Sequence, residues 1–414
     1  MHKVHSYHLH LPLPHVDANK TMRLLYLNRV MRDIVNTLVM FFLPLYLYSL
    51  GETFPLFASL PLSGFQKGML LIGVWGVLSK VVSLISVLPI STKVVQIGHK
   101  KALTYSYLLR VIAFACLFLA NTHPLFLIVG LVLEAIQTSL FWNSYLTILS
   151  NHALQKNMGK DLGLQQFFTQ LVTAVAPAVS GLIAAVFGLE FVYIVGIAFT
   201  LIELSVSLQM ELSIRSKSPS WKEFKQWWKE AAFRAFALTH ASRTLHDSVL
   251  YIWPLYVFFI LGSVEKVGLL YTTTLFLVLF ASAFLGTVVS KSSSKKPYYV
   301  SGSILSLLWL LRIQVLGPIS IAVVDAIGRL TGNFHWLFYD MTYLKRASGK
   351  RAYSFFVYAD IISIATSLSF WSIFSIYFLL FDSWTALFLF GALSVFGTFK
   401  IEEHGAPSWI KRYE

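Results

Sequence analysis

The stretch KGMLLIGVWGVLSKVVSLISVLPI, residues 67–90, decides the class of protein to which this chain belongs. Only Lys67 and Lys80 are charged in it, and it is longer than the roughly 20 residues with which an apolar helix crosses a bilayer core. The composition of all 414 residues agrees, since 56% are hydrophobic, 13% are charged and the mean hydropathy is +0.67. These values exclude a soluble domain and a disordered chain. We therefore predict an all-α polytopic membrane protein.

Further apolar stretches of similar length lie on both sides of residues 67–90. Together they predict 12 transmembrane helices, at 24–49, 67–90, 102–121, 124–149, 162–187, 190–210, 236–261, 265–290, 298–316, 319–343, 353–381 and 384–400.

The positive charges predict the orientation of these helices. With the N-terminus in the cytoplasm, nearly all loop Lys and Arg residues lie inside, and only Lys67 and Lys266 lie outside. This asymmetry predicts an integral protein of the plasma (inner) membrane with both termini cytoplasmic. The net charge of +14 is spread over short loops between apolar spans, so we expect the lipid bilayer and not nucleic acid as a partner.

The chain repeats itself in order. Pro44-Leu45-Tyr46 returns as Pro254-Leu255-Tyr256, and Trp142 with Tyr145 returns as Trp336 with Tyr339. Three weaker matches follow the same order: Leu108-Leu109-Arg110 with Leu310-Leu311-Arg312, Glu134-Ala135-Ile136 with Asp325-Ala326-Ile327, and Gly159-Lys160 with Gly349-Lys350. We therefore predict two six-helix pseudo-symmetric bundles related by an axis along the membrane normal. The predicted parts are a His-rich cytoplasmic tail (1–23), an N-terminal bundle (24–210), a linker (211–235), a C-terminal bundle (236–400) and a cytoplasmic tail (401–414).

The linker carries its own helix signal. Ser220-Trp221-Lys222-Glu223 has the pattern of a capping box, and Trp221, Phe224 and Trp228 follow at helical spacing among lysines. We predict a short amphipathic helix at the cytoplasmic surface that tethers the two bundles.

At the level of architecture the chain resembles the major facilitator superfamily over roughly residues 24–400. Gly98, His99 and Lys100 match the end of that family's loop motif between helices 2 and 3, although Val95 replaces its acidic residue. Ala176-Pro177 with Ser180-Gly181 resembles the antiporter motif of helix 5 in a degraded form. The resemblance implies a transporter in which helices 1, 4, 7 and 10 line a central cavity.

Polar stripes occur on each of those four helices, and charges inside a membrane need a reason. The predicted substrate-binding residues are Asp33, Asn36, Glu134, Gln137, Arg243, His246, Asp247, Arg329 and Asn333. Arg110, Arg312 and Asp325 are predicted to form structural or gating ion pairs, as Arg110–Glu134 and Arg312–Asp325. Arg29, near a helix end, is expected to reach toward the membrane surface. Asp360 is a weaker candidate for a proton carrier.

These residues predict a secondary active transporter for a small solute, working by alternating access and coupled to protons. Because Arg29, Arg32, Arg243 and Arg329 outnumber Asp33 and Asp247, the predicted substrate is an organic anion or zwitterion, and Asp33 or Asp247 would carry the proton. We expect a monomer and no cofactor. We also expect no metal, because the histidines of residues 2–15 are only a compositional signal.

Two rival interpretations stay open. One is an efflux antiporter for hydrophobic compounds. The other is a polytopic membrane enzyme such as a lipid-linked transferase, although the short loops leave no room for a soluble catalytic domain and no phosphate-binding loop occurs. A transporter-like receptor or assembly factor is a third possibility.

Overall fold

A computed structural model describes residues 20–152, 167–210, 214, 216–291, 296–315, 317–347 and 351–400. These residues form helices and no strand. The helices of the first half are α1 (Lys20–Val35), α2 (Leu43–Glu52), α3 (Gly64–Ile97), α4 (His99–Phe118), α5 (Pro124–His152), α7 (Ala176–Phe187) and α8 (Val192–Leu208). After the linker helix α9 (Trp221–Lys229), the second half contains α10 (Ala231–Leu261), α11 (Val264–Lys291), α12 (Lys296–Leu311), α13 (Pro318–Arg346), α14 (Ala352–Leu380) and α15 (Thr385–Gly397).

A helix lies in each of the twelve ranges expected from the sequence. Eight stretches are long and apolar enough to cross a membrane, and they contain α1 with α2, α3, α4, α5, α7, α8, α10 and α14. The all-helical, membrane-spanning architecture is therefore established, whereas the number of twelve spans in two bundles stays a prediction. The predicted tails at 1–19 and 401–414 lie outside the described residues.

The first predicted span contains a break. A π-helix covers Asn36–Met40, and α2 begins at Leu43 with Pro44 in its first turn. Proline has no backbone N–H and its ring clashes with the preceding turn, so it ends a regular helix before it. Pro254, its counterpart in the repeat, lies inside α10 without a break. Such π-segments frequently mark functional sites, and here the break follows directly on the charged part of α1.

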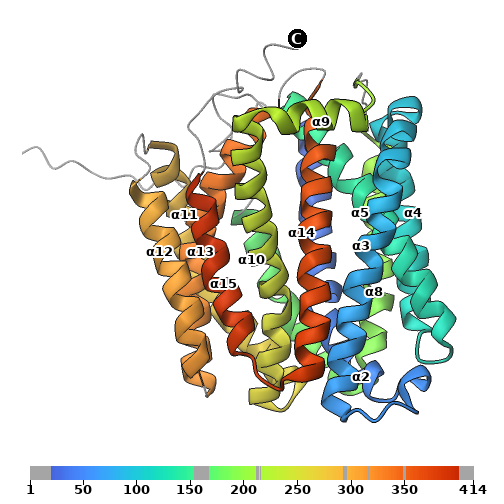
Figure 1. Ribbon diagram of the computed structural model, residues 1–414, viewed down its shortest axis with the longest axis vertical. Coiled ribbons are helices and arrows are strands. Elements are labelled where there is room, and N and C mark those ends of the chain that lie inside the picture. The colour runs from blue at the N-terminus through green and yellow to red at the C-terminus, as the bar shows by residue number, and fades with distance from the viewer. Residues whose placement is uncertain are drawn as a thin grey trace, which may run out of the picture.

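Helices of each half pack mainly on one another, α4 on α5 and α8 in the first half and α12 on α13 and α15 in the second. Two seams join the halves, α3 against α14 and α7 against α11. Figure 1 shows α3 beside α14 in the middle of the molecule, with α2 and α9 at opposite ends.

An aromatic cluster closes the end of the molecule near α2. The ring of Tyr48 lies 5.0 Å from that of Phe259, and the ring of Phe65 lies 6.0 Å from Phe378 and 6.4 Å from Trp384. Tyr48 and Phe65 belong to the first half and the other three rings to the second. We call these five residues the aromatic seal, because they join both halves at this end.

The linker helix α9 lies across the opposite end (Figure 1). As predicted, the Ser220 hydroxyl caps it by accepting from the Glu223 backbone N–H at 3.2 Å. The Glu223 carboxylate turns instead to α14 and its approach, where it accepts from Arg351 at 3.0 Å and from the Tyr358 hydroxyl at 2.9 Å. Trp227 is buried, while Trp221 and Trp228 are exposed. The linker helix is therefore clamped to the second half by its carboxylate.

Candidate functional site: a charged cavity between the halves

A cavity of about 750 Å³ lies between the two halves. Its wall is formed by α1, α3, α5, Leu43 of α2, Met40 of the π-segment and Thr169 from the first half, and by α10, α13 and α14 from the second. Its charged lining residues are Arg29, Asp33, Lys80, Glu134, Arg243, Asp247, Asp340 and Asp360.

The first half presents an arginine held between a carboxylate and an aromatic surface. Arg29 Nε donates to Asp33 Oδ2 at 2.7 Å, one helical turn further along α1. Its guanidinium carbon lies 4.6 Å from the ring centre of Trp142 and 5.8 Å from that of Tyr145, both on α5. Thr169 also donates to Asp33. The guanidinium plane is thereby fixed, and its terminal nitrogens remain available to a ligand.

The second half repeats this arrangement. Arg243 Nε donates to Asp247 Oδ2 at 2.8 Å, again across one turn, and its guanidinium carbon lies 3.9 Å from the ring centre of Trp336 and 5.8 Å from that of Tyr339. Arg243 Nη1 is buried and has no hydrogen-bond partner among the residues that the structure describes. We call each set, Arg29–Asp33–Trp142–Tyr145 and Arg243–Asp247–Trp336–Tyr339, an arginine module. The two aromatic pairs are those matched in the sequence repeat, so the repeat extends to side-chain chemistry.

Three more carboxylates line the cavity. Asp360 accepts from Asn143 at 2.9 Å and from Ser139 at 3.1 Å, and Lys80 lies within its electrostatic reach. Glu134 is almost fully buried, and its Oε2 has no hydrogen-bond partner among the described residues. Asp340 forms no hydrogen bond or ion pair within the described part of the chain. With five acidic and three basic side chains, the lining carries a negative net charge when all are ionised.

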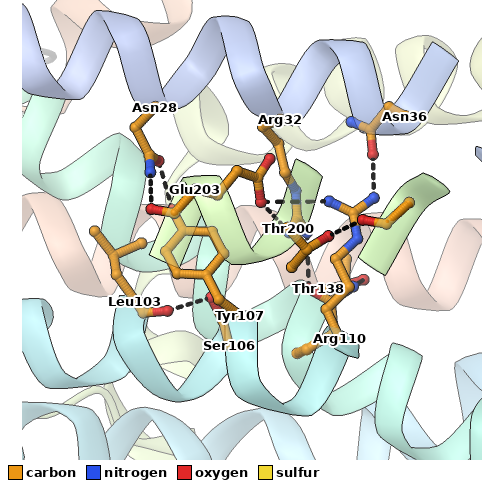
Figure 2. A network of polar contacts seen from close by, with 12 residues as sticks. Asn28, Arg32, Asn36, Leu103, Ser106, Tyr107, Arg110, Thr138, Thr200 and Glu203 are labelled. Carbon is orange, nitrogen blue, oxygen red and sulfur yellow. Dashed lines mark hydrogen bonds and ion pairs between the residues drawn. The ribbon is translucent and has the colours of Figure 1, made fainter. Parts of the chain in front are cut away.

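Behind the cavity wall, the first half buries a polar network, shown in Figure 2. Arg32, Arg110 and Glu203 are at most 2% exposed. Glu203 Oε2 lies 3.9 Å from Arg32 Nη1 and 4.0 Å from Arg110 Nη1. Arg110 also donates to Asn36 at 2.6 Å, and Arg32 donates to Gln137 at 2.7 Å. One carboxylate from α8 thus balances one of the two positive charges from α1 and α4, and Glu134 lies within electrostatic reach of both arginines.

The second half arranges its buried charges differently. Arg329 Nε donates to Asp325 Oδ2 at 2.6 Å along α13, and Thr274 donates to the same oxygen at 3.0 Å. The guanidinium of Arg312 lies 3.8 Å from the ring centre of Trp309 and 4.4 Å from that of Trp253. Arg312 is therefore held mainly by aromatic faces, which stabilise a cation through their quadrupole.

This architecture agrees with the comparisons with known proteins. The sequence profile described as the Major Facilitator Superfamily matches residues 25–334. The chain belongs to the Major Facilitator Superfamily. It is a transmembrane transporter of that superfamily, and no curated protein matches it in sequence.

A solved structure supports the fold of this superfamily member. The chain is similar to the crystal structure of the human organic anion transporter MFSD10 (TETRAN), with a TM-score of 0.67 and 11% identity, over 92% of this chain and 99% of that one. At this identity the likeness concerns the fold.

Within this superfamily cavity, four of the predicted binding residues are lining residues: Asp33, Glu134, Arg243 and Asp247. Five others lie away from the lining. Asn36 and Gln137 bind the buried arginines, His246 packs on Trp336 beside Arg243, and Arg329 and Asn333 lie elsewhere on α13.

The predicted ion pairs are wrong in their partners. The direct ion pair of Arg110 is with Glu203, because α8 brings a deeply buried carboxylate to it, while Glu134 lies within its electrostatic reach. The direct ion pair of Asp325 is with Arg329 on its own helix, while Arg312 lies within its electrostatic reach. The predicted excess of positive charge is also wrong, because Arg32 and Arg329 lie outside the cavity lining, which holds five acidic and three basic side chains.

The cavity residues missing from the prediction follow a recognisable pattern. On α13 the lining residues are Leu337, Tyr339, Asp340, Tyr343 and Leu344, of which Leu337, Asp340 and Leu344 are three and four residues apart. The predicted stripe on this helix consisted of Asp325, Arg329 and Asn333. On α14, the lining residues Phe356, Asp360, Ser363, Ser367 and Trp371 keep helical spacing throughout. These helical spacings are the signal that would have identified Asp340, and they place Asp360, already a candidate proton carrier, in the cavity lining.

Proposed function

We propose that this protein is a secondary active transporter that carries a small solute through the central cavity by alternating access. The observation that carries the proposal is the cavity itself, lined by both halves and holding one arginine module from each. The aromatic seal supports a conformation closed at one end, and rocking of the halves would close the other end. On the charge asymmetry of the loops, the end with α9 is cytoplasmic.

The proposed substrate bears an anionic group together with a compensating positive charge. A guanidinium whose Nε already binds an aspartate still presents terminal N–H groups to a carboxylate or phosphate. A bare anion, however, would enter a lining with five acidic and three basic side chains. The substrate is therefore a zwitterion, or an anion that moves with a proton.

Uptake into liposomes reconstituted with the purified protein tests this function. The panel contains mono- and dicarboxylates, zwitterionic amino acids and organic cations, each assayed with and without a pH gradient. We expect transport of a carboxylate-bearing compound, and we expect Arg29→Gln and Arg243→Gln each to reduce it strongly. Lys225→Gln, on the linker helix, is the matched control that removes a positive charge outside the cavity.

A second function is favoured by one observation. The excess of acidic side chains and the rings of Trp75, Tyr251 and Trp371 in the lining suit a lipophilic cation. Transport of organic cations that is unaffected by both arginine variants would establish this alternative and contradict the carboxylate proposal.

A further inference from the structure

The carboxylate of Asp340 lies in the cavity between the two arginine modules. It lies within electrostatic reach of Arg243 and of Arg29, and it forms no ion pair or hydrogen bond with the residues that the structure describes. Asp33 and Asp247, by contrast, are each engaged by an arginine at 2.7–2.8 Å. Of the three carboxylates near the arginines, Asp340 is therefore the one without a direct partner.

We propose that Asp340 is the proton-binding residue whose neutralisation allows the two arginine modules to accept an anion. With all groups ionised, Arg29 and Arg243 face three carboxylates, those of Asp33, Asp247 and Asp340, and the local net charge is −1. An anion entering this environment is repelled. When a proton binds Asp340, the local charge falls to zero and the guanidinium edges attract the anion.

Two states of the carrier then have the same local charge at this site. The empty site with Asp340 ionised and the loaded site with Asp340 protonated both carry a local charge of −1. Each ligand then favours binding of the other, and this coupling is reciprocal by linkage. Because the same conformational change serves both states at the same charge, one proton accompanies one monovalent anion.

The groups around Asp340 support this assignment over the other cavity carboxylates. The charged or titratable side chains that line the same cavity are Arg29 and Asp33 from α1, Lys80 from α3, Glu134 and Tyr145 from α5, His240, Arg243, Asp247 and Tyr251 from α10, Tyr339 and Tyr343 from α13, and Asp360 from α14. Asp360 is stabilised by Asn143 and Ser139 and has Lys80 nearby. Tyr339 hydrogen-bonds to His240 Nδ1 at 2.7 Å, so its hydroxyl is occupied.

This inference rests on the proposed function, but its test needs no transported solute. Infrared difference spectra of the reconstituted full-length protein, recorded as a function of pH, report the C=O stretch of protonated carboxylic acids. We expect Asp340→Asn to remove one titrating band and Asp340→Glu to retain a band. In Arg243→Gln this band should persist to a pH about one unit higher, because loss of a positive neighbour favours the neutral acid.

Asp360→Asn is the matched control, and the Arg243-sensitive band should remain in it. Identical spectra for the wild type and Asp340→Asn, or a band that Arg243→Gln leaves unmoved, would overturn the assignment to Asp340. If instead the liposome assays show only cation transport while the band behaves as expected, the proposed substrate fails and the proton site stands.

Discussion

The two halves carry the same arginine module on their first helices, yet they bury their remaining arginines in different ways. In the first half, Glu203 of α8 serves Arg32 and Arg110. In the second half, α15 contains no acidic residue, and Asp325 of α13 takes Arg329. Asp325 is the sequence counterpart of Glu134. In the first half Glu203 is the direct ion-pair partner of the buried arginines, and Glu134 lies at the cavity wall within electrostatic reach of both.

This difference shows how a repeated framework acquires asymmetric function. One carboxylate added on a peripheral helix changes the partner of a buried arginine and leaves another carboxylate on the substrate path. The second half achieves neutrality within α13 and stabilises Arg312 with two tryptophans. The next four experiments test this comparison.

The largest effect is expected from Glu203→Gln. It leaves Arg32 and Arg110 buried without their direct ion-pair partner, and breaking a buried ion pair costs about 3–5 kcal/mol. The comparison variant in the second half, Asp325→Asn, should cost less, about 1–3 kcal/mol, because Arg329 is 27% exposed and Arg312 keeps its aromatic contacts. Unfolding of the purified protein in detergent measures both. Equal losses would show that the two halves depend on their acids alike.

Double-mutant cycles measure which arginine and which acidic residue are coupled within each half. We expect a coupling of about 1–3 kcal/mol between Arg329 and Asp325, and of less than about 0.5 kcal/mol between Arg312 and Asp325. The first half supplies the parallel test, in which Arg110 should couple to Glu203 more strongly than to Glu134. A reversed order in either half would restore the pairing expected from the sequence.

The seam between α7 and α11 joins the two halves at a glycine. A Cβ at Gly268 on α11 would lie 2.3 Å from the Pro177 carbonyl oxygen, which belongs to the backbone and has no alternative rotamer. Gly268→Ala should therefore destabilise this closed arrangement of α7 and α11 by about 1–3 kcal/mol. Labelling of a cysteine placed at Phe259, after replacement of Cys116, should become faster as the aromatic seal opens. Gly332→Ala, whose Cβ would meet nothing closer than 3.7 Å, is the control and should leave labelling unchanged.

The smallest effect concerns the aromatic surfaces of the arginine modules. Arg243 lies closer to Trp336 than Arg29 does to Trp142, 3.9 Å against 4.6 Å. Replacing either tryptophan by leucine removes an interaction of about 0.5–2 kcal/mol, with the larger loss of substrate affinity at Trp336. Binding constants for the transported compound check the order, and a larger loss at Trp142 would contradict it.

The sequence alone was sufficient to predict where the helices lie, because a long apolar run inside a membrane has few alternatives to the helical conformation. The repeat also correctly matched Trp142 and Tyr145 with Trp336 and Tyr339. Pairing of buried charges was harder to predict. Helical spacing identifies neighbours on one helix, as for Arg29 and Asp33, but the approach of α8 to α1 and α4 depends on packing of all three. Arg29 was expected at the membrane surface. It is found in the cavity, because the packing of the helices places Trp142 over its guanidinium.

The aromatic seal also determines where the membrane voltage acts. Its five rings bring no charge to their end of the molecule, so on the proposed function most of the electric field would fall across that end, and the cavity would share the potential of the opposite side. A charge carried through the full field changes the balance of the two conformations by about 2.3 kcal/mol per 100 mV. With five acidic and three basic residues lining it, the cavity is a charged compartment that the proposed alternating access would move between two potentials. On that proposal, the membrane voltage sets which side the empty carrier faces.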